Sequence, residues 1–182
     1  MPRIQAERYE QARSKLAGGN KGSALKMLQH IRSVSVHPGD DAGDDSDEAF
    51  IASSARLAAA FEILEWIRER GERALVFIEH RHLQYRFAEL ARRIFDLPEV
   101  QIINGSTPVQ KRMAIVNRFQ RHLDQDDGFD LLVLGPRAAG TGLTLTAANH
   151  VIHLSRWWNP AVEEQCNDRA HRIGQHKPVT IH

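Results

Sequence analysis

Apolar residues recur at helical spacing through the first third of the chain. The stretches 3–16 and 23–34 both show this spacing, and the turn-forming residues 18–20 lie between them. These patterns predict a helical hairpin. A third helical pattern covers 55–70, where Gly71 is a suitable residue to end the helix.

After Gly71 the pattern changes to short apolar runs that alternate with amphipathic stretches. The apolar runs are 74–78, 100–103, 131–134, 151–154 and 179–181. The amphipathic stretches between them are 83–95, 108–123 and 160–173. Compact apolar runs are typical of strands buried on both faces of a parallel sheet. The sequence therefore predicts an α/β fold, with a parallel sheet of five or more strands flanked by helices and preceded by the hairpin.

A cluster of acidic residues divides these two parts of the chain. Its members are Asp40, Asp41, Asp44, Asp45, Asp47 and Glu48. We predict a helical segment at 1–38, a solvated flexible acidic loop at 39–53 and one lobe at 54–182. The lobe ends directly after a predicted strand, so we expect it to be truncated at its C-terminus.

Charge and composition narrow the classes of partner. Hydrophobic residues make up 42% of the chain and charged residues 26%, which is ordinary for a globular protein. Without the six acidic residues above, 24 Lys and Arg face 17 Asp and Glu, and such a basic body suits a phosphate-backbone partner. No apolar run approaches the ~20 residues that span a bilayer, and no signal peptide is visible, so we expect a cytoplasmic protein without a membrane partner.

The metal-binding and thiol residues favour no metal site in this lobe. Cys166 is the single cysteine, which excludes an intramolecular disulfide and a cysteine-based zinc site. Among the ten histidines, His150 and His153 on a predicted strand would point to opposite faces.

The segment QCNDRAHRIGQ at 165–175 carries the strongest chemical signal. On a helix over 160–173, Gln165, Arg169 and Arg172 are spaced i, i+4 and i+7, so they would project from one face and converge on a polyanion. Two guanidinium groups suit the spread charge of a transferring phosphoryl group. The alternative is a surface helix with exposed arginines.

Two further segments follow predicted strands. Gly140 and Gly142 lie in the glycine-rich stretch 137–146, where a turn at the carboxyl end of a parallel strand lets a ligand approach the backbone. Gly105, Ser106 and Thr107 precede a predicted helix and could bind a DNA phosphate. A simple tight turn and ordinary helix capping are the alternatives for these two segments.

Paired tryptophans mark a third junction between strand and helix. Trp157 and Trp158 cannot both be buried easily there, while Asn159 and Pro160 are suited to begin a helix.

Together these segments resemble the C-terminal lobe of the superfamily 2, Swi/Snf-type DNA-dependent ATPases, and bacterial members most of all. The 165–175 segment matches every fixed position of the family's motif VI, Gln-x-x-x-Arg-x-x-Arg-x-Gly-Gln. The stretch 137–146 resembles motif V, 75–79 corresponds to motif IV, and the Trp-Trp-Asn-Pro element is present. The resemblance covers 54–182, and more loosely 3–38.

The resemblance implies a RecA-like lobe and a role for each matched residue. Arg169 and Arg172 would act on ATP, with Arg172 as the arginine finger, while Gly140, Gly142 and Gln165 line the nucleotide cleft. The residues implied to face the backbone of double-stranded DNA are Gly105, Ser106, Thr107, Arg137 and Trp157.

The resemblance also implies what this lobe lacks. ATP and Mg²⁺ would be bound mainly by an N-terminal RecA-like lobe, because no Gly-x-x-x-x-Gly-Lys-Ser/Thr phosphate cradle occurs in this chain. The fragment alone should therefore be inactive. The whole protein would move along DNA in the nucleoid and displace a bound protein that the sequence does not identify.

The chain departs from the family pattern at four positions. Pro136, Ala139 and Thr144 differ from motif V, and Ser155 replaces a usual acidic residue. The hydroxyl contact at Pro136 and the asparagine contact at Thr144 are therefore not carried over. Two alternatives stay open, namely the second lobe of an RNA helicase and a non-catalytic nucleic-acid-binding module.

Overall fold

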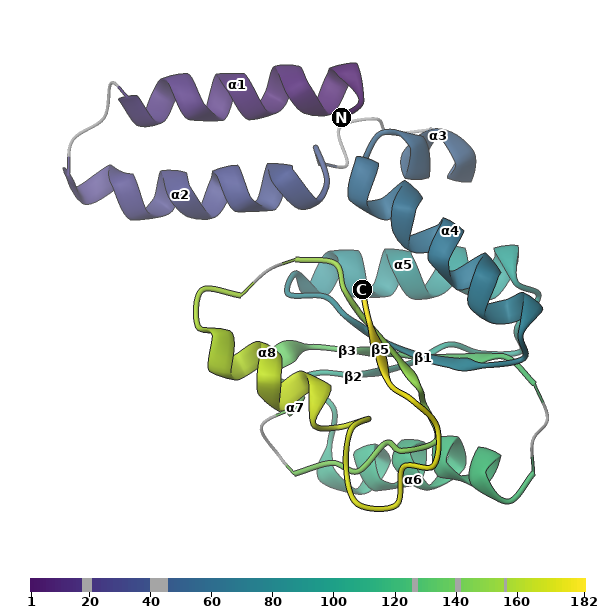
Figure 1. Ribbon diagram of the computed structural model, residues 1–182. Coiled ribbons are helices and arrows are strands. Elements are labelled where there is room, and N and C mark those ends of the chain that lie inside the picture. Colours follow the sequence, from purple (N-terminus) through teal and green to yellow (C-terminus); the bar gives the residue numbers. More distant parts are fainter. Residues whose placement is uncertain (18–20, 40–45, 126–127, 140–141, 156) are drawn as a thin grey trace. The chain divides into compact units, whose positions relative to one another are not determined.

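A computed structural model describes residues 1–17, 21–39, 46–125, 128–139, 142–155 and 157–182 (Figure 1). These residues form two compact units, Met1–Glu62 and Ile63–His182. The division lies within a helix, nine residues after the lobe boundary predicted at residue 54. None of the described helices is long and apolar enough to cross a membrane.

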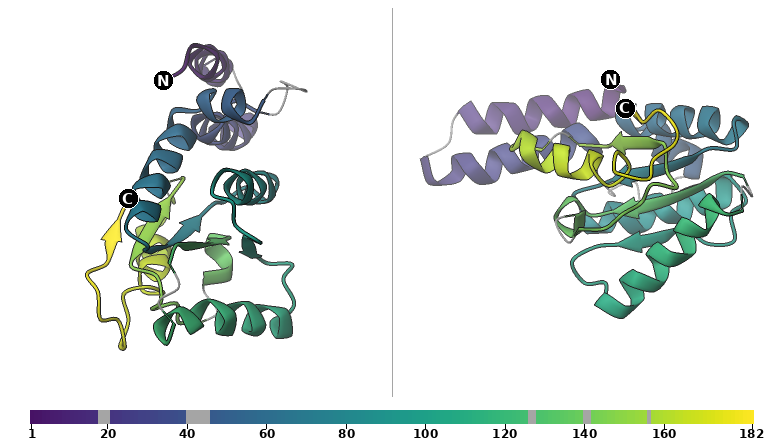
Figure 2. Two further views of the ribbon diagram at one scale, coloured as in Figure 1. Left: turned by 90° about the vertical axis from the view of Figure 1, so that its right-hand side faces the viewer. Right: turned by 60° about the horizontal axis from the view of Figure 1, so that its bottom comes forward.

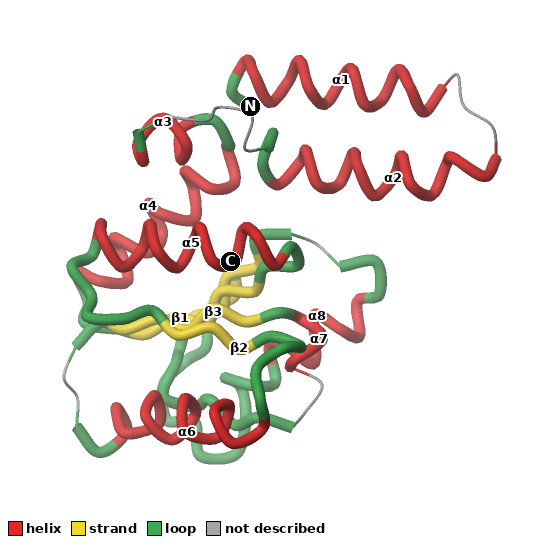
Figure 3. Tube along the Cα trace, turned by 180° about the vertical axis from the view of Figure 1, so that it is seen from behind, coloured by secondary structure: helices red, strands yellow, loops and turns green. Residues whose placement is uncertain are grey.

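The first unit begins with the predicted helical hairpin. Helices α1 (Arg3–Ala17) and α2 (Lys21–Val36) lie side by side (Figures 1 and 3). Buried Gln5 joins them, because its Nε2 donates to the carbonyl oxygens of Val34 and Ser35, both at 3.1 Å. The same side chain accepts from Ala55 N at 3.1 Å, so one amide satisfies backbone groups of three segments.

Part of the predicted acidic loop is helical, and the prediction of a flexible loop over 39–53 is wrong there. Helix α3 covers Asp47–Ala52. Ser46 caps it by accepting from Ala49 N at 3.3 Å, and two acidic residues in the first turn favour the helix dipole. Phe50 is buried against His37, with the ring centroids 4.0 Å apart. Residues 40–45 lie outside the described residues.

The second unit is the predicted parallel sheet with flanking helices. The strands are β1 (Arg73–Phe77), β2 (Gln101–Ile103), β3 (Asp130–Leu134), β4 (His150–His153) and β5 (Thr180–Ile181). Their order is β2-β3-β1-β4-β5, and every pair is parallel. Figure 2 shows β5 as an edge strand. The predicted α/β class is therefore confirmed.

Helices cover both faces of this sheet. They are the part of α4 (Ala55–Glu69) that belongs to this unit, from Ile63 onward, and α5 (Arg81–Ile94), α6 (Val109–Gln120), the 3-10 turn η1 (Arg121–Leu123), α7 (Pro136–Ala139) and α8 (Pro160–Asn167). Helices α5 and α6 lie on opposite faces (Figures 1 and 2). Phe119 of α6 packs in one cluster with Leu132 and Phe77. Every residue of β1 and β3 is buried, which explains their continuous apolar runs.

The helix predicted at 160–173 is too long, and the structure corrects it. Helix α8 ends at Asn167, and 168–175 forms turns. The backbone carbonyl of Arg169 accepts from Leu145 N at 2.8 Å, so a tertiary partner takes the place of a further helical turn. The short helix α7 was not predicted, since its residues fall in the expected glycine-rich turn.

Candidate functional site

Three of the four predicted site segments leave the sheet at one edge. Parallel register places Ile103, Leu134, Phe77 and His153 at the carboxyl ends of four neighbouring strands. Segments 104–107, 135–142 and 154–159 follow three of these ends. This edge is where parallel α/β sheets bind ligands.

A buried polar pair fixes the 104–107 turn. Asn104 is only 3% exposed, and its Oδ1 accepts from Ser106 N at 3.0 Å and from Ser106 Oγ at 2.7 Å. Its Nδ2 donates to Oε1 of buried Gln84 at 3.0 Å, and Gln84 Nε2 donates to the Ile78 carbonyl at 2.7 Å. The turn is thereby anchored beyond the end of β1, and Gly105 and Ser106 remain exposed.

Helix capping does not explain the two hydroxyl groups of this turn. Residue Pro108 precedes α6, and α6 has no side-chain cap. Thr107 Oγ1 instead accepts from Asn104 N at 3.0 Å, inside the turn. Ser106 Oγ accepts from Arg81 Nη2 at 3.0 Å, which brings a cation to the turn.

A hollow of about 280 Å³ lies beside the turn, and its lining includes Tyr85, Ser106, Thr107, Lys111 and Glu99. Hydrogen bonds with Asn104, Arg81 and Ser106 outweigh slight burial and lower the pKa of the Tyr85 hydroxyl. The cationic side chains of Arg81 and Lys111 are both exposed at this surface. The surface can therefore receive an anion.

The glycine-rich segment is described only in part. Gly140 lies outside the described residues, so its predicted role is untested. Gly142 is exposed, and its φ is +73°. Residues that carry a side chain rarely adopt this backbone conformation. Arg137 is exposed on α7.

The two motif arginines have different surroundings. Arg169 is 9% exposed, and it donates from Nε to the Gln165 carbonyl at 2.9 Å and from Nη1 to the Leu143 carbonyl at 3.2 Å. Arg172 is exposed and donates from Nη1 to the Gly142 carbonyl at 3.0 Å. The structure thus brings Gln165, both arginines and Gly142 together, although not on one helical face as predicted.

The tryptophan junction has the predicted start of a helix. Asn159 Oδ1 accepts from Ala161 N at 3.1 Å, and a proline follows at the first helical position. Trp157 is half-buried, and its N donates to Glu163 Oε1 at 2.7 Å. Trp158 is 63% exposed, so the two rings are indeed not both buried.

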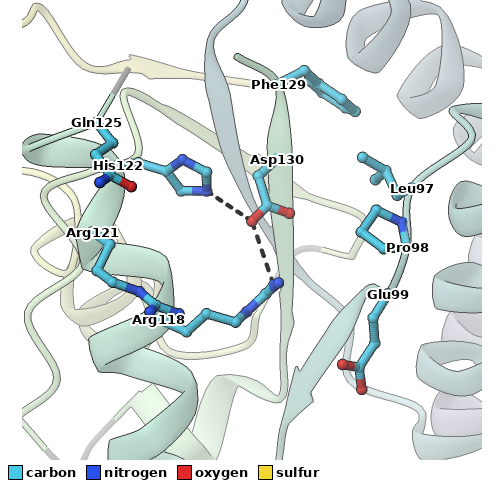
Figure 4. A pocket seen from close by; sticks show the side chains of 9 residues that line it. All are labelled: Leu97, Pro98, Glu99, Arg118, Arg121, His122, Gln125, Phe129 and Asp130. Carbon is cyan, nitrogen blue, oxygen red and sulfur yellow. Dashed lines mark hydrogen bonds and ion pairs between the residues drawn. The ribbon is translucent and has the colours of Figure 1, made fainter. Parts of the chain in front are cut away.

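A larger hollow of about 410 Å³ lies at the opposite edge of the sheet (Figure 4). Asp130, at the start of β3, lies 2.9 Å from His122 Nε2 and 3.4 Å from Arg118 Nη2. Its other oxygen accepts from Leu131 N at 2.8 Å. These contacts hold η1 and α6 to the sheet, away from the predicted site.

Thiol and metal chemistry find no support among the described residues. Burial, partly opposed by Arg169 and reinforced by Glu163, raises the pKa of the Cys166 thiol to about 12. The thiol therefore stays protonated at neutral pH and is a poor nucleophile or ligand. No group of three or more His, Cys, Asp or Glu suited to a metal occurs in the described ranges. His150 and His153 engage different partners, Glu72 and Asn167.

The amides that shape this site were not predicted by the sequence analysis. Asn104 lies in a segment that it singled out, but only the structure shows its hydrogen bonds. Gln175 belongs to the motif and received no role, and Gln84 and Gln120 carry no sequence signal. A glutamine's function depends on which backbone groups it meets, so spacing alone could not reveal these residues.

Comparison with known proteins places this geometry in context. Residues 55–174 match the model of the helicase conserved C-terminal domain. YwqA of Bacillus subtilis, whose assigned name is that of an ATP-dependent helicase/translocase, is 39% identical over 162 residues, which cover 89% of this chain and 17% of YwqA. The mouse SWI/SNF-related matrix-associated actin-dependent regulator of chromatin subfamily A member 1 is 30% identical, with 89% of this chain and 16% of that protein covered.

A solved structure resembles the whole chain. The Sulfolobus solfataricus SWI2/SNF2 ATPase core in complex with double-stranded DNA is 26% identical, with a TM-score of 0.75. The match covers 100% of this chain and 38% of that one. By contrast, the chain spans only about a sixth of the length of YwqA and of the mouse relative.

Proposed function

Since this chain belongs to the helicase conserved C-terminal domain family, as a lobe of the Swi/Snf type, we propose that it is the second motor lobe of an ATP-dependent translocase on double-stranded DNA. One observation carries the proposal. The exposed guanidinium of Arg172 is held at the Gly142 carbonyl, in the connection that follows β3, and the 104–107 turn follows the neighbouring strand β2. An exposed cation and an exposed turn suited to an anion are thus both attached to connections that leave neighbouring strands at their carboxyl ends.

The nucleotide chemistry is divided between two lobes. ATP and Mg²⁺ are held mainly by the N-terminal RecA-like lobe, which supplies the phosphate cradle and the metal ligands. From this chain, Arg172 reaches the γ-phosphate, and its exposure and long side chain fit that task. Arg169, Gln165, Gly140 and Gly142 form this lobe's wall of the cleft.

Contacts to DNA come from the segments that follow the carboxyl ends of the strands. Gly105, Ser106 and Thr107 bind a backbone phosphate, and Arg137 and Trp157 extend the contact. The similar ATPase core from Sulfolobus solfataricus was solved in complex with double-stranded DNA, which supports this assignment. The exposed cations Arg81 and Lys111 strengthen the local attraction for a phosphate backbone.

The cellular role follows from the motor. Closure of the two lobes on ATP moves the protein along DNA in the cytoplasm, at the nucleoid, and displaces a protein bound there. No membrane partner is part of this proposal.

A competition between nucleic acids tests the proposal. The full-length protein should hydrolyse ATP faster with double-stranded DNA than with single-stranded DNA or RNA, as phosphate release would show. This chain alone should bind double-stranded DNA weakly, and the affinity should fall steeply as salt rises because the contacts are to phosphates. Stimulation by RNA instead would favour the RNA helicase. Binding without nucleotide turnover in the full-length protein would favour a non-catalytic module.

A further inference from the structure

A buried loop connects the nucleotide-facing and DNA-facing parts of this lobe. Segment 142–149 contains no helix or strand. Six of its eight residues are nevertheless buried, namely Leu143, Leu145, Thr146, Ala147, Ala148 and Asn149. Loops usually run over the surface, because buried backbone groups need hydrogen-bond partners. The partners of this loop therefore decide where it lies.

Gln120, the last residue of α6, holds the loop from one side. Its Nε2 donates to Thr146 Oγ1 at 3.1 Å, and its Oε1 accepts from Ala147 N at 2.9 Å. Helix α6 begins directly after the 104–107 turn that we assign to DNA. The loop is thus tied to the far end of the DNA-facing helix.

Gln175 holds the same three-residue stretch from the other side. Its Nε2 lies 3.0 Å from the Thr146 carbonyl, 2.8 Å from the Ala148 carbonyl and 3.1 Å from the Ala170 carbonyl. Its Oε1 accepts from Lys177 N at 2.9 Å. One neutral amide therefore hydrogen-bonds with the backbone of the loop and also closes the 168–175 turn. A charged side chain could do the same only at a larger desolvation cost.

The two arginines continue this contact along the loop. Leu145 N donates to the Arg169 carbonyl at 2.8 Å, and the side chains of Arg169 and Arg172 donate to the carbonyls of Leu143 and Gly142. The turn that carries the arginines is therefore bonded to the loop from Gly142 to Ala148. At residues 146–148 the loop is held by both glutamines.

We propose that Gln120 and Gln175 are positioning residues that couple ATP hydrolysis to movement on DNA. They hold the loop to α6 and to the arginine-bearing turn, so a displacement of Arg172 toward nucleotide moves α6 as part of the same body. If the amides are lost, the turn can move while α6 stays in place. This inference rests on the proposed translocase function.

The test measures translocation per ATP consumed in the full-length protein. Gln120→Met and Gln175→Met keep side-chain length and remove the amide. Displacement of a triplex-forming strand from linear double-stranded DNA reports movement, and phosphate release reports hydrolysis. Each variant should displace about 3- to 30-fold less triplex per ATP, the range that lost coupling residues produce. A role in stability alone would lower both rates together and leave their ratio unchanged.

Matched variants make the result decisive. Gln125→Met alters an exposed glutamine and should leave the ratio unchanged. The double variant should lose less than the product of the two single losses, because both amides hold one stretch of loop. If the glutamine variants do not fold, Thr146→Val removes the Gln120 partner with little change of shape and should still lower the ratio.

Two failures are distinguishable. A wild-type protein whose ATPase is not stimulated by DNA overturns the proposed function, and this inference with it. A stimulated wild type whose glutamine variants, or Thr146→Val, keep the normal ratio overturns this inference alone.

Discussion

Burial separates the two motif arginines, although both carry the same charge and stand three positions apart. Arg169 is almost fully buried and donates to two backbone carbonyls of its own lobe. Arg172 is exposed and donates to the Gly142 carbonyl. Hydrogen bonds from a buried charged group contribute much more to stability than exposed ones. The pair should therefore divide into one residue that maintains the fold and one that acts on nucleotide.

Arg172→Ala should affect catalysis and leave stability nearly unchanged. An arginine finger contributes ~10³- to 10⁵-fold in rate in related phosphoryl transfers, so DNA-stimulated kcat of the full-length protein should fall by at least about 100-fold. An exposed arginine contributes only about 0 to 1 kcal/mol to stability, so Tm should hardly change. Arg172→Lys should rescue little, because an ammonium lacks the planar fork. A variant with near-normal kcat would contradict the assignment.

Arg169→Ala should have the opposite profile in this isolated chain. Loss of two hydrogen bonds from a charged donor should cost about 3 kcal/mol or more. In a domain of this size that corresponds to a decrease in Tm of roughly 6 to 12 °C. Thermal unfolding followed by circular dichroism measures the change, with Arg172→Ala as the matched control. Equal shifts for the two variants would show that burial does not separate their roles.

Among the elements, α5 and α6 begin with features that do not favour a helix. Both lack a side-chain cap, and neither has an acidic residue in its first turn. Arg81 and Lys111 instead place positive charge near helix N-termini, where the helix dipole disfavours it. An anion bound near these two N-termini would offset that cost, and the proposed DNA phosphate is such an anion.

Lys111→Glu should therefore stabilise this chain while it weakens DNA binding. We expect a gain of about 0.3 to 1 kcal/mol at low salt from the favourable dipole interaction, measured by urea unfolding. The slope of log affinity for DNA against log salt should become shallower by about 1, since one phosphate contact is lost. Lys26→Glu in α2 makes the same change in net charge and should produce neither effect. Tighter DNA binding by Lys111→Glu would refute the phosphate assignment.

The β4–β5 edge carries a pH-sensitive cluster. His150 Nε2 lies 2.7 Å from Glu72 Oε2, and His150 Nδ1 lies 3.2 Å from His182 Nε2. Burial acts to raise the pKa of Glu72, but hydrogen bonds from His150 and Asn149 and the charges of His150 and Lys177 lower it overall. Burial is the main cause that lowers the pKa of His182, and the charge of His150 lowers it further.

Acid should destabilise this edge in two steps. Glu72 and His182 both bind protons more tightly in the unfolded chain than in the folded one. The stability that they contribute to the folded chain is therefore present above the unfolded pKa and is lost as pH falls. The loss should begin near pH ~6.5 for His182 and near pH ~4.3 for Glu72. Urea midpoints between pH 8 and 3 would show both steps. His182→Gln should flatten the upper step and Glu72→Gln the lower one. A midpoint that rises on acidification from pH 7 to 5 would contradict the prediction.

At the scale of the whole molecule, we propose that the chain carries one wall of a nucleotide cleft. It spans 17% of YwqA and 16% of the mouse relative, and two of its candidate nucleotide residues, Arg172 and Gly142, contact one another. A phosphoryl-transfer site needs a phosphate cradle and metal ligands as well as arginines. Activity should therefore require a second lobe.

This chain in isolation should show no ATPase activity above background. The P-loop lysine, the Mg²⁺ ligands and the acid that activates water are supplied by the N-terminal lobe in our proposal. Phosphate release with and without double-stranded DNA measures the rate, and the full-length protein is the positive control. Mg²⁺-dependent turnover by the purified chain that is abolished by Arg172→Ala would show that the chain contains a complete site.

The sequence by itself determined the sheet, most helices and the family of the chain. Buried parallel strands require continuous apolar runs, so β1 and β3 were visible from the residues alone. The motif spacing also marked Arg169 and Arg172, because phosphoryl chemistry constrains residue type. These features follow from the local pattern of residue types, and the sequence alone contains that pattern.

Tertiary structure alone decided how the site residues are held. Helix α8 ends at Asn167, because the following backbone hydrogen-bonds with the 142–149 loop. The same contacts bury Arg169, leave Arg172 exposed and give Gln120 and Gln175 their partners. Each of these outcomes depends on backbone groups that are 20 or more residues away in the chain. The local sequence pattern carries no information about such partners, because the free energy of a hydrogen bond depends on which donor and acceptor come together after folding.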